Sequence, residues 1–374
     1  MSSKNHTAAI FIDYKKAFDV IDHKLLLDKL SKIGIQGPTL KLFESYLSNR
    51  KFAVMINDEL SELFDVTAGV PQGSILGPKL FLIYMLDLFP ILRFCKILMF
   101  ADDIVILYSH SNFNTCNSIL QADFNILVEW SHDNCLYINM KKTVCMHFCI
   151  KSMRNQNKLN LICHDYECLH NFHTSCNCKC ISQVSSCVYL GLHVDEDFSW
   201  KNHVNHLVSK LRTVVREMTF ARSKLTYSAK RIVYHSIAHS HLNYGITAWG
   251  SANLTPLLDI QKKILYKMCT KNHQNYVTNL YKFWNVLPVN KIFEVKILEL
   301  KYFEHHGTIR QHPYSTRSSR FDVIVEPRSE NKYFERTFEY IVPRLWDTLP
   351  EDLKNFQSII TVKRKLKKWT KKNL

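Results

Sequence analysis

The sequence of 374 residues contains little glycine, with 9 residues, and little proline, with 10. An average composition of about 7% glycine would give about 26, so folds that depend on repeated glycine-rich turns are disfavoured. The longest apolar stretch, Leu80–Leu92, is interrupted by Asp87 and Pro90 and is too short to span a bilayer. Hydrophobic residues still make up 46% of the chain, which indicates a folded protein with room for two or three domains.

The chain also lacks a secretory signal, because charged residues directly follow the short apolar run Ala8–Ile12. We therefore expect an intracellular protein, in the nucleus, the cytoplasm or both, that is neither secreted nor bound to a membrane. The 12 cysteines are then expected to remain as thiols in a reducing compartment.

Charge is distributed unevenly along the chain. Residues 1–150 carry 14 basic and 15 acidic side chains, whereas residues 151–374 carry 35 basic and 18 acidic ones. A nearly neutral first part followed by a strongly basic second part is typical of a protein that binds a polyanion such as a nucleic acid. A basic but solvated surface would give the same count.

Hydrophobic periodicity predicts alternating strands and helices in the first part and mainly helices in the second. Ala8–Ile12 reads as a buried strand, and two apolar runs that flank residues 101–103 read as a hairpin with carboxylates at its turn. The other expected elements are a helix over 18–33, a helix opened by Pro38, a hairpin over 51–66, a helix after Pro78, a helix over 114–130, strands at 136–138, 144–148 and 188–194, helices near 201–224, 227–243, 256–270 and 290–305, and a loop over 306–333.

Three carboxylates fall at the ends of predicted strands: Asp13 after the first strand, and Asp102 and Asp103 at the hairpin turn. Carboxylates on neighbouring strand ends are suited to hold two Mg²⁺ ions about 3.5–4 Å apart. One ion would lower the pKa of an attacking hydroxyl and the other would stabilise a leaving pyrophosphate. Aspartate is also common at exposed turns, so the pair alone is weak evidence for a metal site.

Five ordered motifs surround these carboxylates: FIDYKKAFD at 11–19, GVPQGSILGP at 69–78, FADD at 100–103, INMKKT at 138–143 and YLG at 189–191. The set resembles the palm motifs of reverse transcriptases, and most closely those of non-LTR (LINE-type) retrotransposons of the jockey and CR1-like groups. The likeness is strong over 7–194. It continues more loosely through DEDFSW at 195–200, YGITAWG at 244–250 and RLW at 344–346.

The resemblance implies an α+β fold: a right-hand polymerase palm, with an antiparallel sheet packed on helices, over 1–194. A helical thumb or connection would follow over 195–305 and a basic, helical C-terminal region over 306–374. The family carries a fingers segment before its first palm motif, whereas Asp13 lies twelve residues from the start of this sequence. The expectation is therefore a truncated copy with the fingers largely absent.

Catalytic roles follow from the same resemblance. Asp13 and Asp102 would bind the metal ions, with Asp103 as a weaker ligand of the same site. Lys142 would protonate the leaving pyrophosphate as a general acid. Because Lys141 is adjacent, an ordinary solvated lysine remains the alternative for Lys142.

Substrate contacts are implied for three further motifs. Phe18 matches the steric gate that excludes a ribose 2′-hydroxyl, although its position also fits the core face of a helix. Tyr14, Gln72 and Gly73 would contact the incoming nucleotide or the template, and Gly73 would allow close backbone approach. The primer grip would consist of Tyr189, Leu190 and Gly191.

The implied reaction is RNA-templated DNA synthesis with two Mg²⁺ ions, or Mn²⁺ in their place, on an RNA template, a DNA primer and dNTPs. The basic second part would hold the template–primer duplex, with affinity dominated by counterion release. A catalytically inactive remnant that only binds nucleic acid is the main alternative, and an RNA-templated RNA polymerase is disfavoured by the PQG motif and Phe18. Candidate contacts are Arg212, Arg216, Arg222, Lys224 and the seven basic residues of Thr361–Leu374.

Six cysteines and three histidines fall in the polar stretch 151–187, which reads as an insertion or long loop. Cys176, Cys178 and Cys180 alternate, and in a strand such neighbours lie about 6.5–7 Å apart, too far to share one tetrahedral ion. No C-x₂-C pair is present. The spacing therefore predicts a poorly ordered, metal-free insertion.

Overall fold

A computed structural model describes residues 5–148, 158–170, 178–270, 279–304, 334–354 and 359–372. The chain forms two compact units that divide between Leu190 and Gly191, four residues before the predicted palm boundary. We call them the N-terminal unit and the C-terminal unit. In the described residues, no helix combines the length and apolar character that a membrane span requires.

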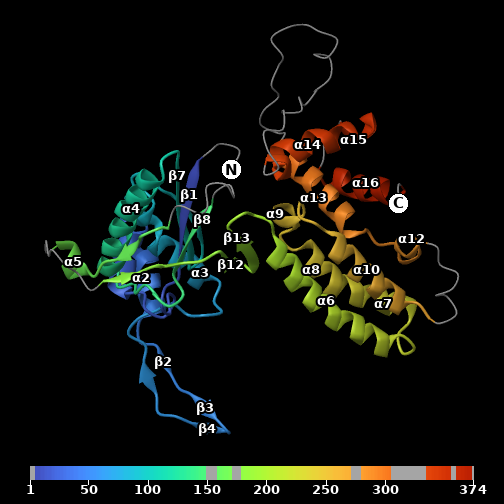
Figure 1. Ribbon diagram of the computed structural model, residues 1–374. Helices are drawn as coiled ribbons and strands as arrows, with labels where there is room; N and C mark the ends of the chain where they lie inside the picture. Colours follow the sequence, from blue (N-terminus) through green and yellow to red (C-terminus); the bar gives the residue numbers. More distant parts are fainter. Residues whose placement is uncertain are drawn as a thin grey trace. The chain divides into compact units, whose positions relative to one another are not determined.

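The N-terminal unit is built on a five-stranded sheet (Figure 1). Its strand order is β11-β8-β1-β7-β6, and every pairing is antiparallel except that of β11 with β8. The central strand β1 is the predicted apolar run, and its residues Ala8, Ile10 and Ile12 are buried in the core. The strands are β1 His6–Ile12, β6 Lys96–Phe100, β7 Asp103–His110, β8 Val144–Phe148 and β11 Ser182–Gln183.

Helices bury their apolar faces in the same core. The longest, α4, packs against β1 and β7. The first helix begins at His23 rather than at the predicted Phe18, because the Asp22 side chain accepts a hydrogen bond from the Leu25 N–H (2.8 Å) and so caps the helix there. The helices are α1 His23–Lys32, α2 Gly37–Leu47, α3 Leu76–Tyr84, the 3₁₀ turn η1 Leu86–Leu88 and α4 Phe113–Asp133.

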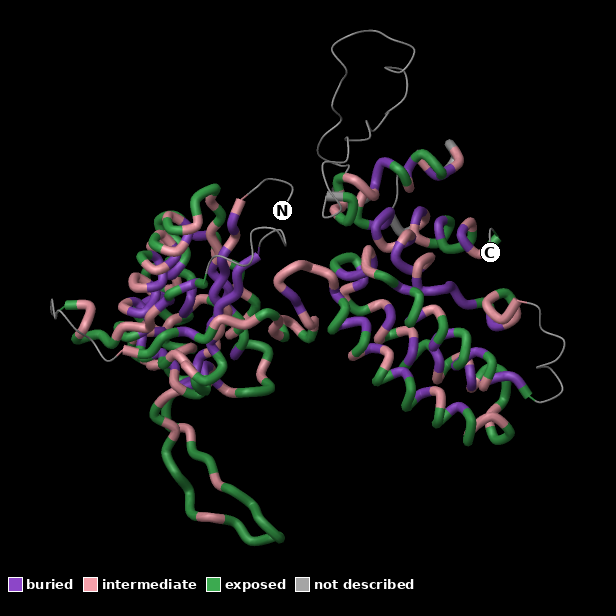
Figure 2. The backbone as a smooth tube through the Cα atoms, viewed as in Figure 1, coloured by how far each residue is buried: buried purple, intermediate pink, exposed green. Residues whose placement is uncertain are grey.

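A long hairpin extends from this unit into solvent, as predicted for 51–66 (Figure 2). Asn57 and Asp58 form its tip with φ of 49° and 66°, and two successive left-handed residues are typical of the tight turns that join antiparallel strands. Its strands are β2 Lys51–Phe52, β3 Met55–Ile56, β4 Glu59–Leu60 and β5 Phe64–Asp65, with β2 paired to β5 and β3 to β4.

Two predicted strands are different in the structure. The predicted strand 136–138 is a single bridge between Ile138 and Tyr14. The predicted strand 188–194 is a hairpin of β12 Ser186–Tyr189 and β13 Leu192–Asp195. Its turn residues Leu190 and Gly191 both have positive φ, 48° and 74°, which reverses the chain.

The described parts of 151–187 are not the loop that polarity predicted. They contain β9 Ile162–Cys163, α5 Tyr166–His170 and β10 Lys179–Cys180 in addition to β11. The reason is that Leu159, Leu161 and Ile181 are buried in the core of the N-terminal unit. Apolar burial at these points attaches the segment to the sheet despite its polar average composition.

In the described residues, the C-terminal unit is helical apart from β13. The four predicted helices are present, with that over 227–243 divided into three successive segments, and further helices that were not predicted individually lie between and after them. The predicted loop 306–333 lies outside the described residues. The elements are α6 Lys201–Ala221, α7 Tyr227–Val233, the π-helical η3 Tyr234–His239, α8 Ser240–Asn243, α9 Ile246–Trp249, α10 Thr255–Met268, α12 Leu280–Trp284, α13 Val289–Glu304, η5 Phe334–Arg336, α14 Phe338–Asp347, α15 Glu351–Lys354 and α16 Ile359–Lys372.

Candidate active site

Asp13 lies at the sheet edge where β1 ends. The β1–β7 pairing ends with Ile12 opposite Ile104, so Asp13 directly follows the last paired residue of β1 and Asp103 directly precedes that of β7. Residues next to the same end of an antiparallel pair lie close together. The register of the sheet therefore brings together carboxylates that are ninety residues apart in the sequence.

The INMKKT motif wraps around Asp13. The Asn139 side-chain amide donates to Asp13 Oδ2 (2.8 Å), and the Asn139 backbone N–H donates to the Asp13 carbonyl (2.7 Å). The Asp13 N–H donates to Thr143 Oγ1 (3.2 Å). Asn139 and Thr143 are thus positioning residues that sequence reasoning quoted within the motif but did not single out. Their polar side chains beside Lys142 were the available signal.

Lys142 presents its ammonium to the same carboxylate, with Nζ 3.7 Å from Asp13 Oδ1. The Lys142 side chain is 69% exposed and that of Asp13 is 35% exposed. An ion pair between side chains this exposed to solvent contributes little to stability. Its significance is positional: a cation that can donate a proton lies beside the carboxylate edge and stays accessible to a ligand.

Asp102 and Asp103 lie at the tight β6–β7 turn, where Phe100 pairs with Asp103. Ala101 has φ of 52°, a left-handed conformation that is uncommon for a residue with a side chain. Partial burial, together with the charges of Asp102 and Asp13, raises the pKa of Asp103 above its usual range. The three carboxylates therefore lie near enough to repel one another.

One pocket collects several of the predicted site residues. It has a volume of about 350 Å³, and Asp13, Asp103, Lys142 and Tyr189 all line it. The Tyr189 ring meets Phe11 edge-on at 5.7 Å, and burial together with the charge of Asp103 raises the pKa of the Tyr189 hydroxyl. Asp102, which sequence analysis ranked above Asp103, is adjacent at the turn and does not line the pocket.

The donor set fits Mg²⁺, which prefers carboxylate oxygens and keeps several water or phosphate ligands. Crowding of like charges at Asp13, Asp102 and Asp103 is a situation that a divalent cation relieves. Among the residues that the structure describes, these three carboxylates are not a set whose ligand atoms all lie within 4.8 Å of one another. A shared ion would need their side chains to move closer together.

The loop that carries Gln72 is fixed against the segment that carries Phe18. The Val70 N–H donates to the Phe18 carbonyl (2.9 Å), and the Gln72 amide donates to Asp19 Oδ1 (2.7 Å). Gly69 has φ of 86°, and a Cβ there would lie 2.8 Å from the Asp19 backbone. Gly69 therefore requires glycine on both counts, whereas at Gly73 a Cβ would meet open space and only the left-handed φ of 79° favours glycine.

The aromatic residues of the first motif have different surroundings. Phe18 is half-buried in a turn before α1 and stacks on Phe81, with ring centroids 4.6 Å apart. Tyr14 is only 5% exposed, and its hydroxyl hydrogen-bonds Ser131 Oγ at 2.7 Å. Its side chain therefore lies in the core of the N-terminal unit.

A separate basic cluster lies in the C-terminal unit. The helix α16 buries Val362 and Leu366 and turns its basic face outward, so the tail is an amphipathic helix. Burial and the charges of Arg231 and Lys367 lower the pKa of Lys371, which indicates locally unbalanced positive charge. A cavity of about 430 Å³ here is lined by Asn285, Arg364, Lys367, Lys368, Lys371 and Lys372.

Comparison with known proteins identifies the class. Residues 1–194 match the family described as reverse transcriptase (RNA-dependent DNA polymerase). That match covers more than half of the 374 residues, and the chain belongs to this family. The resemblance inferred from the five motifs is confirmed.

The chain is similar to proteins of mobile elements. It is 30% identical over 260 residues to the probable RNA-directed DNA polymerase from transposon BS of Drosophila melanogaster, a match that covers 67% of this chain and 27% of the relative. It is 28% identical over 273 residues to the corresponding X-element protein of the same species, with 70% and 28% covered. It is 26% identical over 282 residues to the RNA-directed DNA polymerase from the mobile element jockey of that species, a match that covers 72% of this chain and 29% of the relative.

The chain thus spans less than a third of the length of these relatives. Among solved structures, telomerase from Candida albicans in complex with a telomeric RNA fragment aligns with a TM-score of 0.41 at 13% identity. That alignment covers 73% of this chain and 49% of the telomerase chain.

Proposed function

We propose that this chain is the catalytic part of a non-LTR retrotransposon reverse transcriptase, which extends a primer 3′-hydroxyl with dNTPs on an RNA template. One observation carries the proposal. Asp13 and Asp103 adjoin the same end of the β1–β7 pairing, and Lys142 Nζ lies 3.7 Å from Asp13 in the same pocket. Phosphoryl transfer requires positioning and charge stabilisation rather than a covalent intermediate on the protein, and this edge offers both.

Each residue at the edge has a proposed part. Asp13, Asp102 and Asp103 would hold two Mg²⁺ ions, or Mn²⁺ in their place, while Asn139 fixes the orientation of Asp13 through its 2.8 Å hydrogen bond. When bound, the ions would lower the pKa of the primer hydroxyl and neutralise the leaving pyrophosphate. Lys142 would supply the proton that the pyrophosphate takes up.

Substrate recognition is proposed for the groups around this edge. Tyr189 lines the carboxylate pocket, which supports a primer grip formed with Leu190 and Gly191. The hydrogen bonds between the 69–72 loop and the 18–19 segment hold Phe18 and Gln72 together. Phe18, as the steric gate, and Gln72, as a nucleotide contact, would therefore keep a fixed position relative to each other.

The finer fold assignment is also a proposal. The sheet of the N-terminal unit would be the palm, and the helices of the C-terminal unit would be the thumb and connection. The exposed Arg212 and Arg216 on α6 and the basic cavity at α16 would bind the phosphates of a template–primer duplex in an intracellular compartment.

Primer extension on an RNA template with dNTPs and Mg²⁺ tests the activity. We expect extension by the chain and none by the variant Asp102→Asn. The matched control Asp28→Asn makes the same chemical change on the exposed surface of α1 and should extend as the parent does. Equal extension by Asp102→Asn and the parent would overturn the catalytic assignment.

A second function has its own supporting observation, since the basic cavity at α16 belongs to the C-terminal unit and the carboxylates to the N-terminal unit. Nucleic-acid binding can therefore exist without catalysis. Duplex binding by a chain that extends no primer, with Mg²⁺ or with Mn²⁺, would identify a binding remnant instead of a polymerase.

A further inference from the structure

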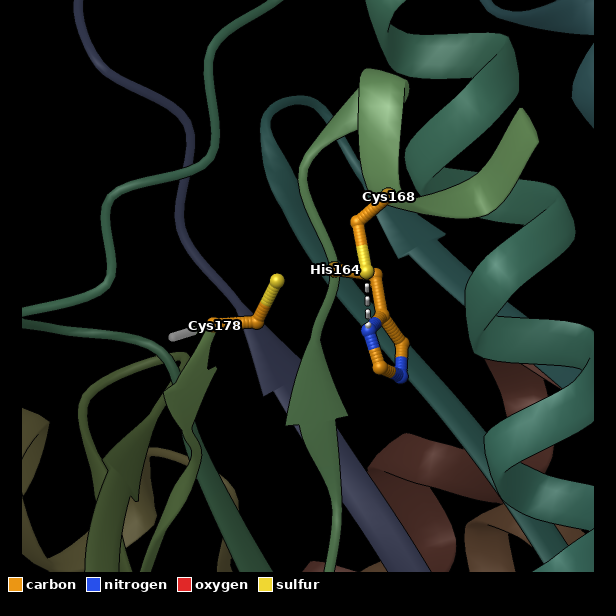
Figure 3. Close-up of side chains that lie close together, drawn as sticks. All are labelled: His164, Cys168 and Cys178. Atoms are coloured by element: carbon orange, nitrogen blue, oxygen red, sulfur yellow. Dashed lines mark hydrogen bonds between the residues drawn. The ribbon is translucent and has the colours of Figure 1, made fainter. Parts of the chain in front are cut away.

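Three soft metal ligands meet in the cysteine-rich segment, away from the carboxylate pocket. His164, Cys168 and Cys178 each place one ligand atom so that all three lie within 4.8 Å of one another. Figure 3 shows the sulfur of Cys178 pointing from the start of one strand toward the other two side chains. Each of the three residues is half-buried, so the ligand atoms are partly shielded from water.

The local fold explains how these residues meet. β9 and β10 pair with Cys163 opposite Lys179, and His164 and Cys178 are the residues that adjoin this last pair. The chain then enters α5, and about one helical turn brings Cys168 back beside His164, which precedes it by four residues. Cys163 points to the other side of β9 because side chains alternate along a strand.

The distance between two of the ligand atoms suits a tetrahedral ion. Zinc binds sulfur at about 2.3 Å and histidine nitrogen at about 2.05 Å, which separates two such ligand atoms by about 3.6 Å. The measured distance from Cys168 Sγ to His164 Nδ1 is 3.4 Å. The backbone N–H of Asp165 also donates to Cys178 Sγ (3.5 Å), a contact of the kind that stabilises a ligating thiolate.

We propose that His164, Cys168 and Cys178 bind a zinc ion, with water in the fourth position. Two thiolates and an imidazole select zinc over the Mg²⁺ that the carboxylate pocket favours. The prediction of a metal-free insertion compared Cys176, Cys178 and Cys180, which alternate along one stretch. It did not consider ligands supplied by two paired strands and a helix.

The ion would hold the segment onto the N-terminal unit. The helix α5 contacts α4 at two points: the Tyr166 ring stacks on His132 at 4.0 Å, and His170 Nε2 lies 3.3 Å from Glu129 Oε1. Zinc would join α5 to β9 and β10. Beyond β10 the chain continues through β11 to β12, which carries Tyr189, so the ion would stabilise the approach to the carboxylate pocket.

Metal analysis of the purified full chain tests the site. After equilibration with zinc and removal of unbound metal, we expect one zinc ion per chain. The variants Cys168→Ser and Cys178→Ser should each reduce this to background. Cys180→Ser is the matched control, because Cys180 lies on the same strand two residues further along and is exposed; it should retain the ion.

Cobalt supplies an independent readout. With Co²⁺ in place of zinc, sulfur-to-metal charge-transfer absorption should appear in the parent and in Cys180→Ser, and it should be lost in Cys168→Ser. If a variant does not fold, the parent still decides the matter: chelation should make residues 158–187 more susceptible to protease, and added zinc should reverse this. A parent without bound zinc, or equal zinc content in Cys168→Ser, would overturn the proposal.

Discussion

Lys142 holds its ammonium 3.7 Å from the carboxylate of Asp13, whereas among the described residues no ion pair involves Lys141. The sequence alone left open which of these adjacent lysines acts. The structure distinguishes them by position, because only one of the two cations lies at the carboxylate edge.

Replacing Lys142 with alanine should lower the rate of primer extension by about 10²–10⁴-fold, the usual contribution of a general acid. Lys141→Ala is the control and should change the rate by less than about tenfold. The loss from Lys142→Ala should be greatest above neutral pH, where water supplies protons least readily. Equal losses from both variants would contradict a specific role for Lys142.

Removing the hydroxyl of Tyr14 should affect stability and leave catalysis unchanged. Tyr14→Phe deletes the 2.7 Å hydrogen bond to Ser131 and should lower the free energy of unfolding by about 1 kcal/mol. Denaturant melts measure this, with Tyr137→Phe as the control because the Tyr137 side chain is 59% exposed. If Tyr14→Phe were as stable as the parent but extended primers less, the result would support the predicted contact between Tyr14 and substrate.

The buried His203 should make the protein less stable in acid. Burial, followed by the charges of His193, His206 and Lys210, lowers its pKa from 6.5 to about 4. Between pH 6.5 and pH 4, His203 therefore binds a proton in the unfolded chain but not in the folded chain. Stability from this group is complete above pH 6.5 and is lost as pH falls toward 4, by about 1–3 kcal/mol.

Unfolding measured between pH 7 and pH 4 checks this dependence. His203→Gln should flatten the curve, because glutamine can accept the 3.4 Å hydrogen bond from the His193 N–H without titrating. His110→Gln on β7 should leave the pH dependence in place. An unchanged slope in His203→Gln would show that other groups cause the acid sensitivity.

The basic face of α16 can be tested without removing the helix. Lys367→Ala with Lys371→Ala deletes two charges of the cavity and leaves Val362 and Leu366 packed. The log–log salt dependence of duplex binding should become shallower by about two. The control pair Lys262→Ala with Lys263→Ala removes equal charge from the exposed face of α10. If both double variants changed the salt dependence equally, the effect would come from net charge rather than from the position of α16.

The sequence by itself determined much of this protein. Alternating apolar runs placed β1, β6, β7 and the main helices, because backbone periodicity depends on residues close in the chain. The ordered motifs identified the family for a similar reason: each one is a local set of side chains with a defined chemistry. The start of α1 was misplaced because an N-cap, at Asp22, outweighed the hydrophobic pattern before it.

Only the tertiary structure decided which distant residues meet. The pairing of β1 with β7 brings Asp13 and Asp103 to the same sheet edge, and packing against α4 turns Tyr14 toward Ser131. The pairing of β9 with β10 brings His164 to Cys178. Pairing depends on burial and hydrogen bonding between segments far apart in the chain, and a shift of one residue would send every side chain of a strand to the opposite face.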